Sequence, residues 1–217
     1  MRYALLPAKP LALAKSRLAP HVNQDDRVSL SYAMFQDVLE CLCRAPSVDA
    51  AAVVTADRRL LELARRTGAL AIDEERPRGL NGAAALGTAR CVDRGATSVL
   101  IVLSDLPLLT PEEVDALYVD LPSGPHVRLV RSHEGLGTNA LLRMPPWAIS
   151  TRFGGRSYQD HVAAAADAEV ACSSVDLPGL AFDIDTIDDL RELARLERPS
   201  RTRIEAEKIG LVPLRAD

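Results

Sequence analysis

The sequence has few cysteines and no long apolar run. Its four cysteines, Cys41, Cys43, Cys91 and Cys172, lack metal-ligand spacing, so we expect no zinc site and structural thiols in a reducing cytoplasm. The opening MRYALLPAKP is too short in apolar residues for a signal peptide. No later stretch reaches the roughly 18 apolar residues that a membrane span needs. We therefore expect a cytoplasmic protein that does not engage a membrane.

The chain also lacks an excess of positive charge. Its 26 Lys and Arg residues stand against 30 Asp and Glu, which gives a formal net charge of −4. Binding to a nucleic-acid backbone needs a basic face, so nucleic-acid polymers are poor candidate partners. A local cluster of basic side chains could still bind a small anion.

The composition is that of an ordinary globular protein, with 47% hydrophobic and 26% charged residues in 217. Apolar runs rich in β-branched residues alternate with Ala/Leu/Arg stretches of helical period, which predicts an α/β fold with a mostly parallel central sheet flanked by helices. We expect strands at 2–7, 50–55, 69–72, 98–103, 127–131, 139–143 and 170–175. We expect helices at 25–44, 57–67, 81–94, 111–120, 157–166 and 187–196. Residues 1–196 would form one domain, and 197–217 a C-terminal extension.

A basic loop follows the first predicted strand, where α/β sheets commonly bind ligands. It contains Lys9, Lys15, Ser16 and Arg17. The Ala-Lys-Ser sequence is similar to the end of a Walker A motif, but the earlier glycines are missing, which excludes an ordinary P-loop. The ammonium and guanidinium groups could still hold a triphosphate. A solvated basic loop without a ligand is the equally weighted alternative.

Two acidic positions favour a divalent metal. Asp105 stands at the carboxyl end of a fully apolar strand, where an aspartate is a frequent Mg²⁺ ligand. Asp183 and Asp185 share one face of an extended segment. Either position alone could be a helix cap, and Asp185 favours that interpretation because Asp188 and Asp189 follow in the first turn of a predicted helix. Together the two positions suggest a metal clamp.

Two glycine-containing segments are weaker candidates. Residues 135–140 match G-x-G-x-x-A, but prolines stop the segment too soon for a dinucleotide-binding helix. We expect instead a turn that exposes Thr138 and Asn139, with an ordinary hairpin as the alternative. Residues 152–157 precede a helix whose free N–H groups could bind a phosphate or carboxylate, unless the segment is a capped, solvent-facing turn.

Three further polar residues carry less information. Asn81 lies at the start of a predicted helix, where it could cap the helix or contact a base. His133 and His161 lie near the expected site, but the sequence shows no catalytic grouping around either one. A surface position is the favoured interpretation for both histidines.

Taken in order, these segments resemble the CofC/FbiD guanylyltransferases over about residues 1–196. The resemblance rests on Pro7-x-Lys9, Ala14-Lys15-Ser16-Arg17-Leu18, Gly79-Leu80-Asn81, Ser104-Asp105-Leu106-Pro107-Leu108-Leu109, Gly137-Thr138-Asn139-Ala140, Arg152-Phe153-Gly154-x-x-Ser157 and Asp183-x-Asp185-Thr186. It implies a single-domain, GT-A-like (Rossmann-like) nucleotidyltransferase fold. Ser104 departs from the family's usual alanine and Ile187 from its common proline, and neither change removes an expected ligand.

The resemblance implies transfer of GMP from GTP to a phosphorylated three-carbon acid, with release of pyrophosphate, in coenzyme F-420 biosynthesis. The acid would be phosphoenolpyruvate, 3-phospho-D-glycerate or 2-phospho-L-lactate, and the sequence does not choose among them. The product would pass to the partner transferase of the pathway. A monomer and a homodimer are both compatible with the sequence.

The resemblance also implies residue roles. Asp105 and Asp185 would hold Mg²⁺, with Asp183 as a close candidate. Lys9, Lys15, Ser16 and Arg17 would bind the triphosphate, and Gly79 and Asn81 would lie near the guanosine. Thr138, Gly154 and Ser157 would bind the acceptor. Lys15, Arg17 and Asp105 would carry catalysis through positioning and charge neutralisation, without a protein nucleophile.

Two other functions remain open at this point. Another nucleotidyltransferase of the same fold, with a molybdopterin or sugar-phosphate acceptor, would use the same loop and aspartates. A non-catalytic nucleotide-binding regulatory module is the other alternative. The presence of both Asp105 and Asp185 argues against such a module, and pyrophosphate release would decide between them.

Overall fold

The computed structural model describes residues 1–196 and 198–213. In this part of the chain, a seven-stranded sheet has the order β3-β2-β1-β4-β6-β5-β7. The strands are β1 (Arg2–Pro7), β2 (Ala50–Thr55), β3 (Leu70–Asp73), β4 (Ser98–Val102), β5 (His126–Arg131), β6 (Thr138–Met144) and β7 (Ala171–Ser174). Among these strands, β6 is the one that runs antiparallel to its neighbours. The expected α/β fold with a mostly parallel sheet is confirmed.

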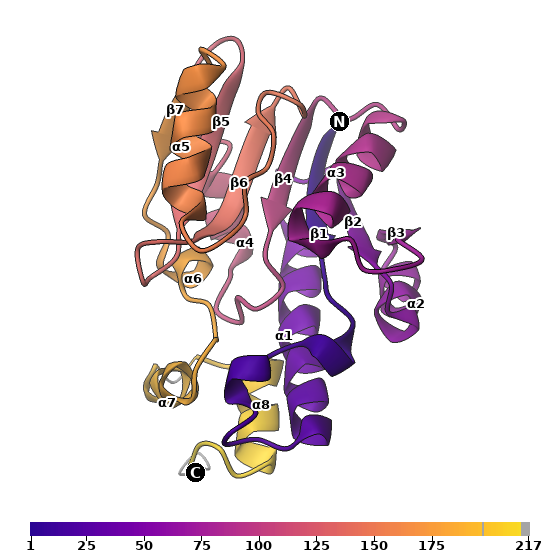
Figure 1. Cartoon of the computed structure of the whole chain (residues 1–217), viewed down its shortest axis with the longest axis vertical. Helices are drawn as coiled ribbons and strands as arrows, with labels where there is room; N and C mark the ends of the chain where they lie inside the picture. Colours follow the sequence, from indigo (N-terminus) through magenta and orange to yellow (C-terminus); the bar gives the residue numbers. More distant parts are fainter. Residues whose placement is uncertain (197, 214–217) are drawn as a thin grey trace.

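Helices cover both faces of this sheet (Figure 1). They are η1 (Leu11–Leu13), η2 (Ser16–Leu18), α1 (Gln24–Arg44), α2 (Arg58–Arg66), α3 (Gly79–Val92), α4 (Pro111–Ala116), α5 (Ser157–Asp167), α6 (Pro178–Ala181), α7 (Ile187–Arg195) and α8 (Arg201–Lys208). The expected helices agree with α1 to α5 and α7 to within a few residues, except at the end of α4.

Alternation along the strands divides the interior into two apolar layers. Leu6 and Leu100 pack toward α1, α2, α4 and α6, whereas Leu5 and Ile101 pack toward α3 and α5. All four side chains are fully buried. Burial of a side chain of this size contributes about 2 kcal/mol, so both layers hold the sheet in place.

A glycine sets the distance between α3 and β1. A Cβ atom at Gly87 would lie 2.5 Å from Cδ1 of Leu5, which is closer than carbon atoms approach. Any larger residue would have to displace the Leu5 side chain. The missing side chain of glycine lets α3 pack directly on the central strand. The first turn of α3 is thereby held beside the carboxyl ends of β1 and β2.

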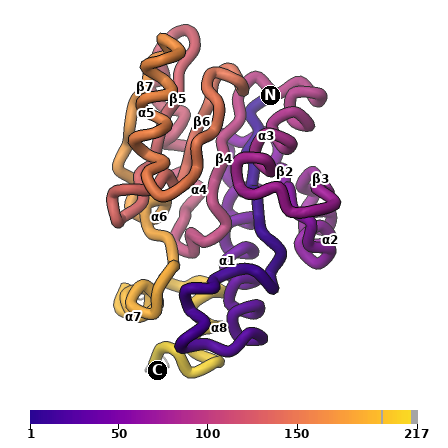
Figure 2. Tube along the Cα trace, viewed as in Figure 1, coloured from indigo at the N-terminus to yellow at the C-terminus, as the bar shows by residue number. Residues whose placement is uncertain are grey.

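A third apolar cluster lies beyond the carboxyl edge of the sheet. It joins Leu18, Leu30, Leu190 and Ala206, which come from η2, α1, α7 and α8. Figure 2 shows α8, near the yellow end of the trace, alongside indigo α1. Through Leu18, this cluster anchors the loop after β1.

A half-buried carboxylate attaches α8 to α1. Asp37 accepts hydrogen bonds from the backbone N–H groups of Arg201 and Thr202, both at 2.9 Å, and from Oγ1 of Thr202 at 2.6 Å. Burial raises the pKa of Asp37 even though these hydrogen bonds oppose the change. The helix falls within the segment that we expected to be an extension, and the division at residue 196 stays a prediction.

Helix α4 ends at Ala116, whereas the sequence pattern continues to 120. Its start is as expected, with Thr110 and Glu113 forming a capping box. After α4, Arg128 of β5 donates to the carbonyl oxygens of Val119 at 2.5 Å and Asp120 at 3.2 Å. The N–H groups of Leu117, Tyr118 and Val119 bond to carbonyl oxygens three residues back instead of four. Asp120 then adopts a left-handed backbone with φ of 50°, so the α-helix gives way to a turn whose carbonyl oxygens Arg128 holds.

Within the described residues, no helix combines the length and the apolar character that crossing a bilayer requires.

Candidate active site

A cavity of about 540 Å³ opens at the carboxyl ends of β1 and β4. It lies between the loop after β1, the start of α3 and the segment before α7. Seven of the residues expected from the sequence line it: Lys9, Lys15, Ser16, Arg17, Gly79, Asp105 and Asp185. The parallel strands bring their carboxyl ends to one edge, so residues distant along the chain meet there.

Lys15 points into a pair of carboxylates. Its Nζ lies 2.6 Å from Oδ2 of Asp105 and 3.1 Å from Oδ1 of Asp185, and its side chain is 7% exposed. Burial alone would lower the pKa of Lys15, but the two carboxylates outweigh burial and raise it, so the ammonium stays charged. The backbone of Lys15 is left-handed, with φ of 52° and ψ of 41°, a conformation that costs a non-glycine residue about 1–2 kcal/mol.

Arg17 reaches the same acidic group from the solvent side. Its Nη1 donates to Oδ2 of Asp185 at 2.8 Å, and its own side chain is 69% exposed. Burial of Asp185 opposes ionisation, but Lys15, Arg17 and Lys9 together lower its pKa below the usual range. Asp185 is therefore ionised at neutral pH.

Asp105 has free capacity to bind a cation. Its Oδ1 is buried and accepts no hydrogen bond from the described residues, although its Oδ2 contacts Lys15. Mg²⁺ is commonly held by one or two carboxylates together with substrate phosphates. The described residues contain no group of three or more His, Cys, Asp or Glu side chains that could hold a metal alone. Asp105 and Asp185 thus fit a metal that binds together with phosphates.

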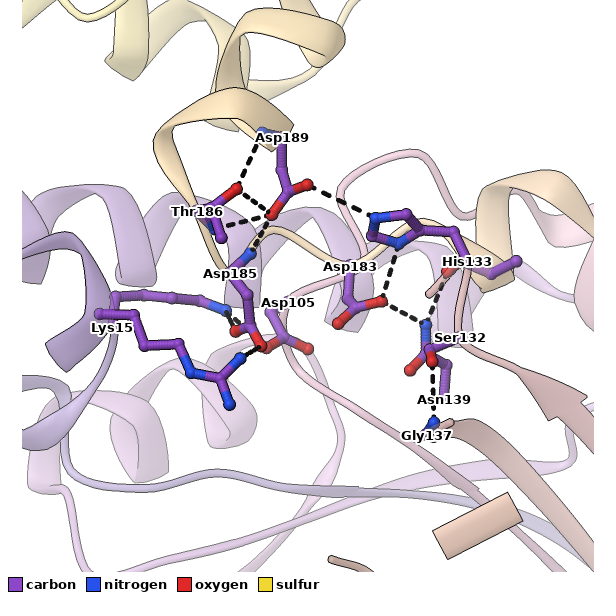
Figure 3. Close-up of polar contacts among 12 residues, drawn as sticks. Lys15, Asp105, Ser132, His133, Gly137, Asn139, Asp183, Asp185, Thr186 and Asp189 are labelled. Atoms are coloured by element: carbon purple, nitrogen blue, oxygen red, sulfur yellow. Dashed lines mark hydrogen bonds and ion pairs between the residues drawn. The ribbon is translucent and has the colours of Figure 1, made fainter. Parts of the chain in front are cut away.

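Asp183 belongs to a neighbouring network (Figure 3). Its Oδ1 accepts from Nδ2 of Asn139 at 3.0 Å and lies 3.2 Å from Nδ1 of His133. Burial, together with the negative charges of Asp105 and Asp185, raises the pKa of Asp183 against the effect of Asn139. Its proposed part as a metal ligand stays a prediction, because one of its oxygens already has protein partners.

Asp189, rather than Asp185, caps the start of α7. One oxygen of Asp189 accepts from the backbone N–H of Asp185 at 2.9 Å and of Thr186 at 2.7 Å, while its other oxygen lies 3.4 Å from Nε2 of His133. The interpretation of Asp185 as a helix cap is therefore wrong. The cap belongs to Thr186 and Asp189, which leaves the Asp185 side chain free to meet Lys15 (Figure 3).

Thr138 and Asn139 are buried, so the expectation that the glycine turn exposes them is wrong. The strand begins at Thr138, and its pleat sends the two side chains to opposite faces. The backbone N–H of Thr138 donates to Oγ of Ser157 at 2.9 Å, and Oγ1 of Thr138 lies 3.0 Å from Nδ1 of His161. Both expected acceptor-binding hydroxyls thus have internal partners.

His161 is fully buried, which corrects its expected surface position. Its Nε2 accepts the backbone N–H of Arg152 at 2.8 Å, so the proton of the neutral ring lies on Nδ1, facing Thr138. A second proton, on Nε2, would point at the N–H of Arg152, which is itself a donor. Burial first, and then the nearby Arg143, lower the pKa of His161 to about 4.

The remaining expected residues lie in the loop before α5 or contact it. Asn81 donates from Nδ2 to the carbonyl oxygen of Phe153 at 2.9 Å and accepts the N–H of Phe153 at 2.8 Å, which ties α3 to this loop. A Cβ atom at Gly154 would meet open space. Asn81, Thr138, Gly154 and Ser157 do not line the cavity, and their contacts with guanosine or acceptor stay predictions.

Sequence reasoning missed Glu74 and the contacts of Asp189 as parts of this region. Glu74 lines the cavity and is buried, but it follows a short strand with no recognisable pattern around it. Asp189 carried one usable signal, since it stands three residues after Thr186, the spacing of a capping box.

Comparisons with known proteins identify relatives along most of the chain. The family model described as "Guanylyl transferase CofC like" matches residues 2–210, beyond the limit near 196 inferred from the motifs. A phosphoenolpyruvate guanylyltransferase of Sphaerobacter thermophilus is 41% identical over 191 residues, covering 88% of this chain and 91% of its own. A 2-phospho-L-lactate guanylyltransferase of Methanothermobacter thermautotrophicus is 34% identical, covering 88% of this chain and 82% of its own.

A solved structure confirms the fold. A protein of Desulfovibrio desulfuricans G20, described as a nucleotide-diphospho-sugar transferase, superimposes with a TM-score of 0.75 at 20% identity. The match covers 95% of this chain and 94% of that one. The expected GT-A-like nucleotidyltransferase fold is thus confirmed.

Proposed function

The chain belongs to the family of CofC-like guanylyl transferases, and from this premise we propose that it transfers GMP from GTP to a phosphorylated three-carbon acid in coenzyme F-420 biosynthesis. It is an enzyme of the nucleotidyltransferase class. Phosphoenolpyruvate is the first acceptor to test, since the relative with 41% identity bears that name. 3-Phospho-D-glycerate and 2-phospho-L-lactate are the other two candidates.

The observation that carries the proposal is the cavity with Lys15 between Asp105 and Asp185. The cavity combines cationic side chains with acidic ones at a single edge. A nucleoside triphosphate with a divalent cation needs both, because the phosphates bind Lys and Arg while the cation binds carboxylates. Among the residues that the structure describes, no histidine or cysteine lines this cavity, which suits a reaction without a protein nucleophile.

In the proposed reaction, a phosphate oxygen of the acid attacks the α-phosphorus of GTP in line. The new bond joins this oxygen to the α-phosphorus, the bond to the bridging oxygen of the β-phosphate breaks, and pyrophosphate leaves. Lys15 and Arg17 would neutralise charge on the phosphates, with Lys9 and Ser16 as further contacts from the same loop. Positioning of the two anions supplies the rest of the rate enhancement.

Mg²⁺ is the cation that we propose for Asp105 and Asp185. When bound, such an ion polarises phosphoryl oxygens and offsets their charge. The ammonium of Lys15 now balances these two carboxylates, so binding of the ion requires Lys15 to shift its contacts toward the phosphates. Asp183 is a candidate for a supporting role through its network with His133 and Asn139.

Pyrophosphate release tests the proposal directly. The purified protein is incubated with GTP and Mg²⁺, together with each of the three acids in turn, and with no acid as the control. We expect release only when an acid is present, with GTP far better than ATP, CTP or UTP, and the partner transferase should consume the product. Absence of acid-dependent release would overturn the proposed reaction and would favour a non-catalytic nucleotide-binding module.

A molybdopterin or sugar-phosphate acceptor is tested in the same assay. Activity with such an acceptor and none with the three acids would mean that the chain is a nucleotidyltransferase of the same fold with a different acceptor.

A further inference from the structure

Glu74 is a buried carboxylate in the cavity wall that the proposed reaction does not use. It follows β3 directly, is 3% exposed, and lines the same cavity as Lys15 and Asp105. Its Oε2 accepts one weak hydrogen bond, from the backbone N–H of Arg78 at 3.3 Å. A carboxylate has about four acceptor positions, so most of the capacity of Glu74 is left for another partner.

The position of Glu74 places it at the far end of the cavity from Asp105 and Asp185, the carboxylates proposed to hold the metal. The sheet order β3-β2-β1-β4 puts three strand spacings between the ends of β3 and β4. At about 4.8 Å per spacing, this is a separation of about 14 Å. A nucleotide that lies along the cavity with its phosphates near Asp105 would therefore direct its base toward Glu74.

Apolar side chains surround this end of the cavity. Leu11, Leu60 and Ala83 are buried and line it, and Leu80 lines it from the first turn of α3. Such walls suit the flat faces of a purine ring. They do not distinguish one purine from another, so discrimination requires a polar group at the edge of the ring.

We propose that the Glu74 carboxylate selects guanine, by accepting hydrogen bonds from N1–H and the 2-amino group of the base. This inference rests on the proposed function, in which GTP is the donor. Guanine presents these two donors side by side, and two carboxylate oxygens match them. Adenine presents an unprotonated N1 and a C–H at the same edge, which would leave the buried carboxylate without partners.

A purely structural role for Glu74 is the alternative to exclude. Its contact with Arg78 lies at the start of α3, so Glu74 could simply hold this turn. Glu74→Gln separates the two roles, because a glutamine oxygen can still accept from Arg78. The glutamine amide, however, would face the guanine 2-amino group with another donor. It matches xanthine instead, whose O2 is an acceptor.

The experiment measures binding of GTP, XTP and ITP by calorimetry, and kcat/KM for acid-dependent pyrophosphate release. The three proteins are the wild type, Glu74→Gln, and the control Glu75→Gln. Glu75 is the exposed neighbour of Glu74 and does not line the cavity. For Glu74→Gln we expect GTP binding to weaken at least tenfold and the ratio of XTP to GTP affinity to rise at least tenfold. The KM for the acid and the melting temperature should stay close to wild type, and Glu75→Gln should match wild type throughout.

ITP provides a test that needs no variant. Inosine lacks the 2-amino group, so the wild type should bind ITP about tenfold more weakly than GTP. Equal binding of ITP and GTP, or an unchanged XTP to GTP ratio in Glu74→Gln, would overturn the role of Glu74. If the wild type instead releases no pyrophosphate from GTP with any acid, the proposed function fails as well, and the two failures are thereby distinguished.

Discussion

The two sides of the site differ in how their polar groups are used. On the side expected to bind the nucleotide, called the nucleotide side below, Lys15 forms ion pairs with Asp105 and Asp185, and all three line the cavity. On the expected acceptor side, Thr138 and Ser157 are buried and hydrogen-bonded within the protein. Both sides carry residues of the family motifs, but the first holds exchangeable ion pairs and the second holds completed hydrogen bonds.

This difference shows that residues of the same family motifs can contribute mainly to ligand binding or mainly to the stability of the fold. An ion pair of partly solvated groups can be replaced by contacts with a ligand at little cost to the fold. A buried hydrogen bond cannot be released without leaving an unsatisfied group. Substitutions on the nucleotide side should therefore change activity, whereas those on the acceptor side should change stability as well.

Asp105→Asn should have the largest effect on activity. The amide retains the shape of the side chain but removes the charge that would hold Mg²⁺, so we expect pyrophosphate release to fall at least about a thousandfold. The melting temperature should change little, as measured by circular dichroism. Turnover of Asp105→Asn close to wild type, or full activity of the wild type in excess chelator, would show that Asp105 does not hold a metal needed for the reaction.

Lys15→Ala and Arg17→Ala should rank next, with Lys15 the more important. Lys15 is buried between two carboxylates, while Arg17 is largely exposed. We expect kcat/KM for GTP to fall about a hundredfold for Lys15→Ala and about tenfold for Arg17→Ala. Arg17→Ala should leave the melting temperature unchanged, because exposed ion pairs contribute little to stability. Wild-type kinetics in both variants would mean that the loop is only a solvated basic segment.

His161 should make the acceptor side sensitive to acid. Its pKa is lowered to about 4 in the folded protein, against about 6.5 in the unfolded chain, so the unfolded state binds the extra proton first. Stability is fully present above pH 6.5 and falls by up to about 3 kcal/mol from this group as the pH approaches 4. Denaturant unfolding at several pH values should show a smaller loss for His161→Gln than for wild type.

Other acidic groups titrate in the same range, but they are shared by both proteins and cancel in the difference. An equal pH dependence for wild type and His161→Gln would show that folding does not lower the pKa of His161.

Ser157→Ala should have the smallest effect, and it should appear in stability. The variant leaves the buried N–H of Thr138 without its acceptor, so the free energy of unfolding should fall by about 1–2 kcal/mol. Gly154→Ala is the matched comparison, because its Cβ meets open space and should change stability by less than about 0.5 kcal/mol. Both variants should raise the KM for the acid and leave GTP affinity nearly unchanged. If Ser157→Ala alters only the acid KM, the contrast between the two sides is wrong.

The sequence predicted the features that depend on local pattern. The bounds of β1 and β2 agree with expectation, because buried parallel strands read as continuous apolar runs. The meeting of Lys15 with Asp105 followed from the rule that strand ends converge at one edge. Strand polarity and helix period were therefore enough to bring Lys15, Asp105 and Asp185 to one edge of the sheet.

The remaining features depend on contacts between distant segments. The orientation of Thr138 required knowing the first residue of β6, since a shift of one residue reverses the face. The turn after α4 is held by Arg128 from another strand. Glu74 lines one cavity with Lys15 and Asp105, which are distant from it along the chain. None of these has a signal within its own neighbourhood of the chain.

The reversed direction of β6 has a consequence for how the site could diversify. Because β5 ends and β6 begins at the same edge, the hairpin from Ser132 to Gly137 lies at that edge, where His133 contacts Asp183. The hairpin is closed by the Gly137 N–H to Oγ of Ser132 at 2.9 Å and by the Ser132 N–H to the Gly137 carbonyl oxygen at 3.0 Å, and Leu136 within it is exposed. Residues exchanged or inserted between these ends would leave the strand ladder intact. This hairpin is thus a module through which acceptor choice could be exchanged between relatives while the nucleotide side stays constant.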